Sequence, residues 1–291
     1  MTAATIEKTT HTLEVPGATL AYDVRRNEST SEPILLLIGS PMGAAGFESL
    51  AGHFTHRTVV TYDPRGSERS KRTDGAKENK VEEHADDLHR LVEAVGGPVD
   101  IFASSGGAIN AMALIQRHPE QVRTLVAHEP PAATALPDRD AVLAAARDIH
   151  ETYMRSGTGP GMAKFIALTG HRGPVPADWT DQPAPDPAQF GLPTEDDGSR
   201  DDPLLGMAMM SNPFFELDYD ALRTASTRII FAAGAESEGE MANRGAYAVA
   251  ERLGKEPVVF PSHHGGFLGG EYGWPGDPDA FGPKLREVLG S

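Results

Sequence analysis

Short runs of apolar residues alternate along the chain with longer stretches in which apolar residues recur every three or four positions. The first pattern is typical of buried strands and the second of amphipathic helices. We predict eight strands, over residues 12–15, 19–24, 34–38, 58–62, 99–103, 124–127, 228–232 and 257–260. Because strands and helices alternate, the expected fold class is α/β, with helices covering a mostly parallel sheet.

Turn and helix signals agree with this order of elements. Pro16-Gly17 separates the first two strands and predicts an antiparallel hairpin. Amphipathic helices are expected over residues 47–54, 81–95, 246–253 and 281–289. The second of these is followed by Gly96-Gly97-Pro98, a typical signal for the end of a helix.

One long segment, residues 131–225, contains no convincing strand. Helical patterns over 139–153 and 161–168 are followed by a proline-rich, acidic run over 181–203. We predict a helical cap inserted between the sixth and seventh strands, so that residues 1–130 and 226–291 form the core domain. The large apolar side chains of this cap would either line a lipophilic pocket or pack against one another inside the cap. They are Met154, Met162, Phe165, Trp179, Phe190, Met207, Met209, Met210, Phe214 and Phe215.

Composition narrows the classes of function. The chain has 42 acidic and 26 basic residues, a formal net charge of −16, which argues against nucleic acid or an anionic membrane as partner. It has no cysteine, which excludes disulfides, thiolate catalysis and iron–sulfur clusters. The first residues lack the apolar stretch of a secretory signal, and the longest aliphatic run, 34–38, is far shorter than the roughly 18 residues that span a bilayer. We therefore expect a soluble, cytoplasmic protein whose partner is a small molecule, with a homodimer left open.

Ser105 lies in the first segment that carries chemistry. The predicted strand over 99–103 leads into Ala103-Ser-Ser-Gly-Gly107 and then into a helix, the context that a nucleophile elbow requires. Because this turn is tight, the residues two before and two after the nucleophile must be small. Ala103 and Gly107 meet that requirement for Ser105, whereas Ser104 would place Phe102 at one of those positions. The alternative interpretation is a plain turn between a strand and a helix.

A second turn, after the strand over 34–38, could supply backbone donors. It reads Gly39-Ser40-Pro41, and in a doubly wound sheet it would lie beside the elbow. The N–H groups of Ser40 and Gly106 would then form a two-donor oxyanion hole. The alternative is a dinucleotide-binding turn at Gly39-x-x-x-Gly43-x-x-Gly46, with Asp63 as the ribose ligand, but its spacing does not match Gly-x-Gly-x-x-Gly.

A third segment places two histidines in a glycine-rich loop near the end of the chain. The last predicted strand is followed by Ser262-His263-His264-Gly-Gly-Phe267. Histidine is suited to proton transfer near neutral pH. Two adjacent histidines could instead bind a metal ion, but no carboxylate stands at ligand spacing, so we predict neither a metal site nor a cofactor.

Together these residues give the chain a resemblance to α/β-hydrolase-fold proteins, in particular to esterase-like members with a helical cap. The resemblance extends from the hairpin to the last helix. The family's His-Gly-x-Pro, Asp-x-Arg-Gly-x-Gly-x-Ser, Gly-x-Ser-x-Gly and His-Gly-Gly-Phe motifs appear here over residues 38–41, 63–70, 103–107 and 264–267. It implies an α/β-hydrolase fold with an eight-stranded sheet, and it selects His264 over His263 as the catalytic base.

The acid of the implied triad is the least clearly marked member. The family usually places an Asp three residues past the glycine of the loop after the cap, where this chain has Ser237. Glu236 is therefore our first choice and Glu238 the second. Glu129, at the end of the sixth strand, occupies a rarer location known in this fold. The order Ser105, Glu236, His264 matches the family's order of nucleophile, acid and base.

The resemblance implies a serine hydrolase that cleaves an ester, lactone or related carbonyl bond of a small, fairly apolar substrate through an acyl-enzyme. Carbon–carbon bond hydrolases, thioesterases and cofactor-free perhydrolases use the same triad. A different class of function is also open, because the scaffold can serve as a non-catalytic protein that binds a small molecule. Ile38 in place of the family's loop histidine gives that alternative some weight.

Overall fold

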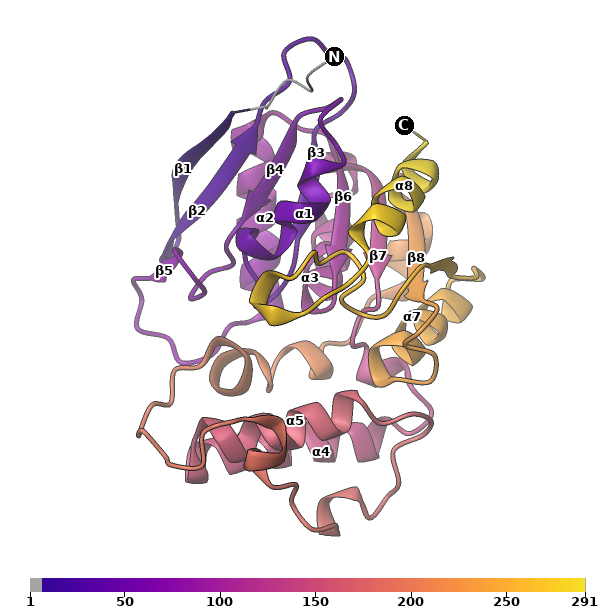
Figure 1. Ribbon diagram of the computed structural model, residues 1–291. Coiled ribbons are helices and arrows are strands. Elements are labelled where there is room, and N and C mark those ends of the chain that lie inside the picture. Colours follow the sequence, from indigo (N-terminus) through magenta and orange to yellow (C-terminus); the bar gives the residue numbers. More distant parts are fainter. Residues whose placement is uncertain (1–6, 291) are drawn as a thin grey trace.

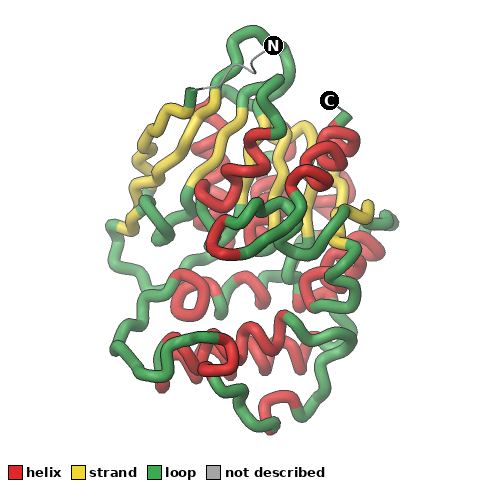
Figure 2. The backbone as a smooth tube through the Cα atoms, viewed as in Figure 1, coloured by secondary structure: helices red, strands yellow, loops and turns green. Residues whose placement is uncertain are grey.

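All eight predicted strands are present in the computed structural model, which describes residues 7–290. They lie in one sheet with an additional two-residue strand, β5, which pairs with β2 (Figures 1 and 2). The strands are β1 (Lys8–Val15), β2 (Ala18–Arg25), β3 (Leu35–Ile38), β4 (Val59–Tyr62), β5 (Lys71–Arg72), β6 (Val99–Ser104), β7 (Val122–His128), β8 (Arg228–Gly234) and β9 (Val258–Phe260).

The strand order is β1-β2-β4-β3-β6-β7-β8-β9. β2 is antiparallel to both of its neighbours in this order, β1 and β4, and β1 and β2 form the hairpin predicted at Pro16-Gly17. From β4 to β9 every pair is parallel, so the carboxyl ends of β3, β6, β7, β8 and β9 lie at one edge of the sheet. This edge is where loops from distant parts of the sequence meet.

Alternate residues of each central strand pack on opposite faces of the sheet. In β3, Leu36 and Ile38 belong to the core shared with α2 (Val81–Val95), α3 (Gly106–Arg117) and α7 (Met241–Arg252). Leu35 and Leu37 belong to the core shared with α1 (Glu48–Gly52) and α8 (Pro278–Leu289). Both faces are covered, which explains why β3 is apolar throughout rather than alternating with polar residues. The predicted α/β fold class, with helices covering a mostly parallel sheet, is thereby confirmed.

The segment between β7 and β8 is helical, as the sequence indicates. It contains α4 (Arg139–Ser156), α5 (Thr158–Thr169) and α6 (Tyr219–Thr224), with the short helical turns η3 (Ala133–Ala135), η4 (Trp179–Asp181), η5 (Pro187–Phe190), η6 (Pro203–Ala208) and η7 (Asn212–Phe214). We call residues 131–225 the cap segment. In Figure 1, α4 and α5 lie below the sheet, on the side where the parallel strands end. Of the helices within residues 7–290, none is long and apolar enough to cross a bilayer.

Three further helical turns lie in the connections outside the cap segment. The turn η1 (Ala44–Phe47) precedes α1, and η2 (Pro119–Gln121) connects α3 to β7. A last turn, η8 (Glu271–Gly273), lies in the loop between β9 and α8. These connections are short, so the positions of the loops that follow β3, β6, β7 and β8 are set by the rigid sheet.

Candidate active site

Ser105 occupies a sharp turn between β6 and α3. Its backbone has φ 56° and ψ −129°, a conformation that is unfavourable for a residue with a side chain. A Cβ added to Gly107 would lie 2.9 Å from the backbone of Gly39, so only glycine fits where the two loops touch. Ser104 is the last residue of β6, and its buried hydroxyl pairs with His128 Nδ1 at 3.1 Å. Of the two serines, Ser105 is the one that lines a cavity.

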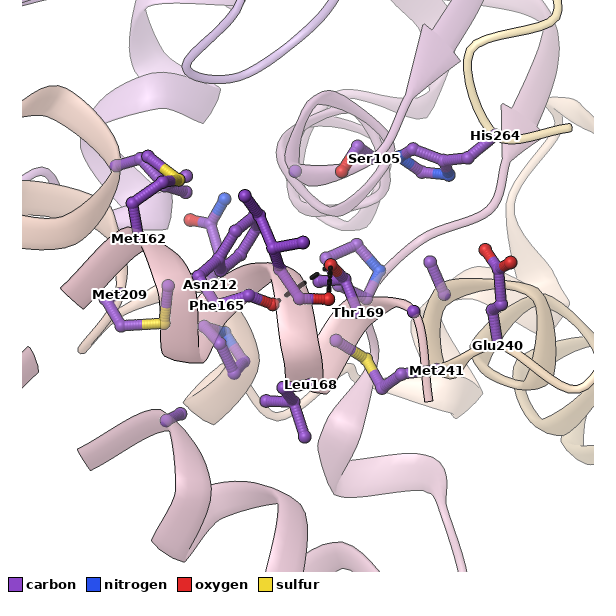
Figure 3. A pocket seen from close by; sticks show the side chains of 18 of the residues that line it. Ser105, Met162, Phe165, Leu168, Thr169, Met209, Asn212, Glu240, Met241 and His264 are labelled. Atoms are coloured by element: carbon purple, nitrogen blue, oxygen red, sulfur yellow. Dashed lines mark hydrogen bonds between the residues drawn. The ribbon is translucent and has the colours of Figure 1, made fainter. Parts of the chain in front are cut away.

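His264 faces Ser105 across the edge of the sheet (Figure 3). It follows β9, and its Nδ1 donates to Glu129 Oε2 at 2.6 Å. Its Nε2 is thereby the ring nitrogen left to interact with Ser105. The neighbouring His263 is engaged in its own loop, since its Nδ1 accepts from Gly265 N–H and its Nε2 pairs with the Pro275 carbonyl.

Glu129 immediately follows β7 and is fully buried. Its backbone has φ 46°, which turns the side chain toward the loops after β8 and β9. One carboxylate oxygen, Oε1, accepts from Gly234 N–H at 2.8 Å, from Asn243 Nδ2 at 3.1 Å and from the Ser237 hydroxyl. The other oxygen, Oε2, is left for His264. Both oxygens of the buried carboxylate thus have hydrogen-bond donors, as burial requires.

This arrangement corrects our first choice of acid. Glu236 and Glu238 are both exposed, and their side chains make no hydrogen bond to His264. The loop after β8 places Ser237 inward and the two flanking glutamates outward. Ser237 is fully buried and its hydroxyl donates to Glu129. The position at which the resemblance places the acid therefore holds a hydroxyl that donates to Glu129, the carboxylate at the end of the neighbouring strand β7.

The pair of Glu129 and His264 perturbs both pKa values. Burial favours the neutral form of His264, but the hydrogen bond and charge of Glu129, with a smaller contribution from Glu240, outweigh it and raise the pKa above its ordinary value. Burial likewise opposes ionisation of Glu129, yet the bond to His264 and the neighbouring donors lower its pKa to about 2. Glu129 is therefore ionised at neutral pH and stabilises a proton on His264.

Ser40 and Gly106, whose N–H groups the sequence predicts as an oxyanion hole, both line the cavity that contains Ser105. Their backbones are adjacent, because a Cβ on Gly106 would lie 2.6 Å from the Ser40 carbonyl oxygen. Gly106 begins α3, where an N–H group has no partner within the helix and the helix dipole favours negative charge.

The cavity has a volume of about 790 Å³ and lies between the sheet edge and the cap segment (Figure 3). Its walls are mainly apolar. Of the ten large apolar cap residues singled out in the sequence, four line it, namely Met162, Phe165, Phe190 and Met209. Three of the other six pack within the cap segment or against the core, namely Trp179, Phe214 and Phe215, and Met154 is 46% exposed. Both interpretations of these residues are thus correct for part of the set.

The sequence reasoning missed three residues around this site. Asn243, on α7, helps to hold Glu129, and Glu240, at the start of α7, lines the cavity near His264. Asn212 reaches the cavity from η7 of the cap segment. No motif marks these positions. The one signal available was the serine at 237, in the place of the usual acid, which indicated that the carboxylate had to come from elsewhere.

The sequence of this chain is similar to those of known proteins. The sequence model described as "alpha/beta hydrolase fold" matches residues 32–168. The chain is 32% identical over 272 residues to the uncharacterized hydrolase YraK of Bacillus subtilis (strain 168), covering 88% of this chain and 89% of that protein.

Solved structures agree in fold. A thermophilic esterase from Thermogutta terrifontis has a TM-score of 0.65 at 20% identity, covering 97% of this chain and 98% of its own. The enol-lactonase from Burkholderia xenovorans LB400 has a TM-score of 0.64 at 15% identity, covering 97% of this chain and 100% of its own.

Proposed function

The chain belongs to the α/β-hydrolase fold family, and from that premise we propose that it is a serine hydrolase acting on an ester or lactone through Ser105, His264 and Glu129. The observation that carries this proposal is the geometry at the sheet edge. A serine in a strained elbow faces a histidine whose other ring nitrogen is bonded to a buried, ionised carboxylate. This constellation activates a hydroxyl for attack on a carbonyl.

In the first half of the reaction, His264 Nε2 takes the proton of Ser105 as Oγ forms a bond to the carbonyl carbon. The carbonyl π electrons move to oxygen, and the N–H groups of Ser40 and Gly106 stabilise that oxyanion. Glu129 holds Nδ1–H and stabilises the imidazolium. When the intermediate collapses, the bond to the leaving oxygen breaks, and Nε2–H protonates the departing alcohol. The acyl group remains on Ser105.

In the second half, His264 takes a proton from water as the water oxygen attacks the acyl carbon. The tetrahedral intermediate forms in the same oxyanion hole. Its collapse breaks the bond to Ser105, whose Oγ regains the proton from Nε2, and the carboxylic acid leaves. Atoms balance as ester plus water to acid plus alcohol, and the enzyme is regenerated.

The cavity supports a substrate with a sizeable apolar part. Met162, Phe165, Leu168, Met209 and Met241 form apolar walls that would remove such a group from water. Glu240 brings a carboxylate to the same cavity, so an acyl or alcohol group that ends in an anion would be repelled. We therefore propose a neutral, apolar ester or lactone rather than a dicarboxylate.

Treatment with a fluorophosphonate probe, followed by intact-mass measurement and peptide mapping, tests the proposal. We expect one probe per chain on Ser105, and none on the Ser105→Ala variant. The matched control is Ser104→Ala, which removes the adjacent hydroxyl outside the cavity and should still be labelled. Absence of labelling on folded protein would contradict the proposal and favour a protein that only binds a small molecule.

A further inference from the structure

Asn212 lies beside the proposed oxyanion hole, although it belongs to the cap segment. It is 6% exposed and borders the same cavity as Ser105 (Figure 3). Its Nδ2 is the nearest atom to the position that a Cβ on Gly106 would occupy, and the Ser40 carbonyl is the next. The carboxamide therefore packs directly against the backbone whose N–H groups would bind the oxyanion.

The amide nitrogen of Asn212 makes no hydrogen bond to any residue within 7–290. The one side-chain interaction of Asn212 in that range is a long contact, 3.5 Å, between the Ser211 hydroxyl and Oδ1. The residue is 6% exposed and borders the cavity, and its nitrogen is open to that space rather than enclosed in the core. A donor that faces the cavity with no protein partner is available to a bound molecule.

Contacts with the core hold Asn212 in place. The Ser211 hydroxyl donates to the Asn79 carbonyl at 2.6 Å, and Asn79 N–H donates to the Met207 carbonyl at 2.9 Å. Asn79 is itself buried, and its side chain donates to the Arg65 carbonyl at 3.2 Å. The cap segment is thus hydrogen-bonded to the core through Ser211, the residue before Asn212. This contact holds the carboxamide of Asn212 over the turn that carries Ser105.

We propose that Asn212 is a further catalytic residue, whose Nδ2 donates a hydrogen bond to the substrate oxygen that becomes the oxyanion. This inference rests on the proposed function. A fixed donor in a cavity with apolar walls acts on a developing charge more strongly than the same donor in water. The oxyanion hole would then have two donors from the core and one from the cap segment. All three donors are in place only when the cap segment packs against the core.

The test compares Asn212→Ala, Asn212→Asp and Gln189→Ala with wild type. The first removes the donor. The second keeps the size of the side chain, so that packing is retained, but replaces the donor with a carboxylate. Gln189 lies in η5 of the same cap segment, but it is exposed and does not line the cavity. Gln189→Ala is therefore a matched loss of one carboxamide outside the site.

The main readout is the second-order rate constant of fluorophosphonate labelling at Ser105, since the adduct carries an oxygen in the place of the oxyanion. We expect Asn212→Ala to lower it by about 10- to 100-fold, somewhat less than the loss of a principal oxyanion donor. Asn212→Asp should lower it further, and Gln189→Ala should stay within about 2-fold. On an ester substrate the loss should fall on kcat, with KM changed by less than about 3-fold.

The outcomes separate the two proposals. If wild type and Asn212→Ala are labelled at the same rate, the role of Asn212 is refuted while the serine-hydrolase proposal stands. A change confined to KM refutes it as well, because the amide would then bind ground state and transition state equally. If Ser105 of wild type is not labelled at all, the proposed function fails and the role of Asn212 fails with it. Thermal unfolding of each variant checks that the fold is retained.

Discussion

Substitution of Glu129 by glutamine is the sharpest test of which carboxylate serves His264. Oε1 of Glu129 accepts from Gly234 N–H, Asn243 Nδ2 and the Ser237 hydroxyl, and Oε2 accepts from His264. A glutamine at this position has one oxygen and one NH₂ group. The three donors that surround the Oε1 position require the amide oxygen there, so the NH₂ group must take the Oε2 position and face His264.

The expected loss follows from the tautomer that this orientation imposes. An NH₂ group facing Nδ1 makes that nitrogen an acceptor, which puts the ring proton on Nε2 and leaves no base for Ser105. Replacement of a triad acid by its amide lowers kcat by about 10⁴-fold through the same effect, and we expect a similar loss here. Loss of the carboxylate charge also lowers the pKa of His264, which Glu129 raises. Residual activity should therefore persist to lower pH than in wild type.

The assay is the pH profile of kcat/KM on a p-nitrophenyl ester, measured beside Glu236→Gln. That control makes the same change of charge on an exposed side chain and should remain within about 2-fold of wild type. Thermal unfolding would show that both variants are folded. Retention of more than about a tenth of the activity by Glu129→Gln would refute the reasoning, as would an equal loss in Glu236→Gln.

Three further predictions test the surroundings of the site. Ser237→Ala removes one donor that orients Glu129, so kcat/KM on a p-nitrophenyl ester should fall by about 3- to 10-fold. Gly107→Ala should lower Tm, because its Cβ would lie 2.9 Å from backbone, whereas Gly52→Ala, with nothing within 4 Å, should not. His128 is fully buried with a pKa lowered to about 4, mainly by burial, so its neutral form stabilises the fold at pH 7. That contribution is lost as pH falls from about 6.5 toward 4, and denaturant unfolding should show about 2 kcal/mol lower stability from this residue at pH 5.

Several features of the site could be read from neighbouring residues in the sequence. The elbow requires small residues two positions on either side of the nucleophile, and Ala103 and Gly107 mark it. In the structure a Cβ at Gly107 would indeed meet backbone of the loop after β3. The choice of Ser105 over Ser104 rests on the same steric argument. It agrees with the positions of the two side chains, one in the cavity and the other buried against His128.

Neighbouring residues in the sequence do not indicate which glutamate contacts His264. Glu129 and His264 are 135 positions apart, and their contact depends on the turn after β7 and on the loop after β9. Three glutamates stood near suitable strand ends, and nothing in the local pattern shows which one points inward. The structure decides it, because β8 continues into a turn that buries Ser237 and leaves Glu236 and Glu238 in solvent.

The sequence by itself determined the order of strands and helices, the two covered faces of the sheet and the elbow. Each of these depends on side-chain periodicity or on backbone sterics within a few residues. They can therefore be read from the local sequence, without knowledge of which distant segments come into contact. The tertiary structure alone decided that Glu129 pairs with His264 and that Asn212 lies over Gly106. Both contacts join segments far apart in the sequence, 135 positions in the first case, which only the packing of the sheet and the cap segment brings together.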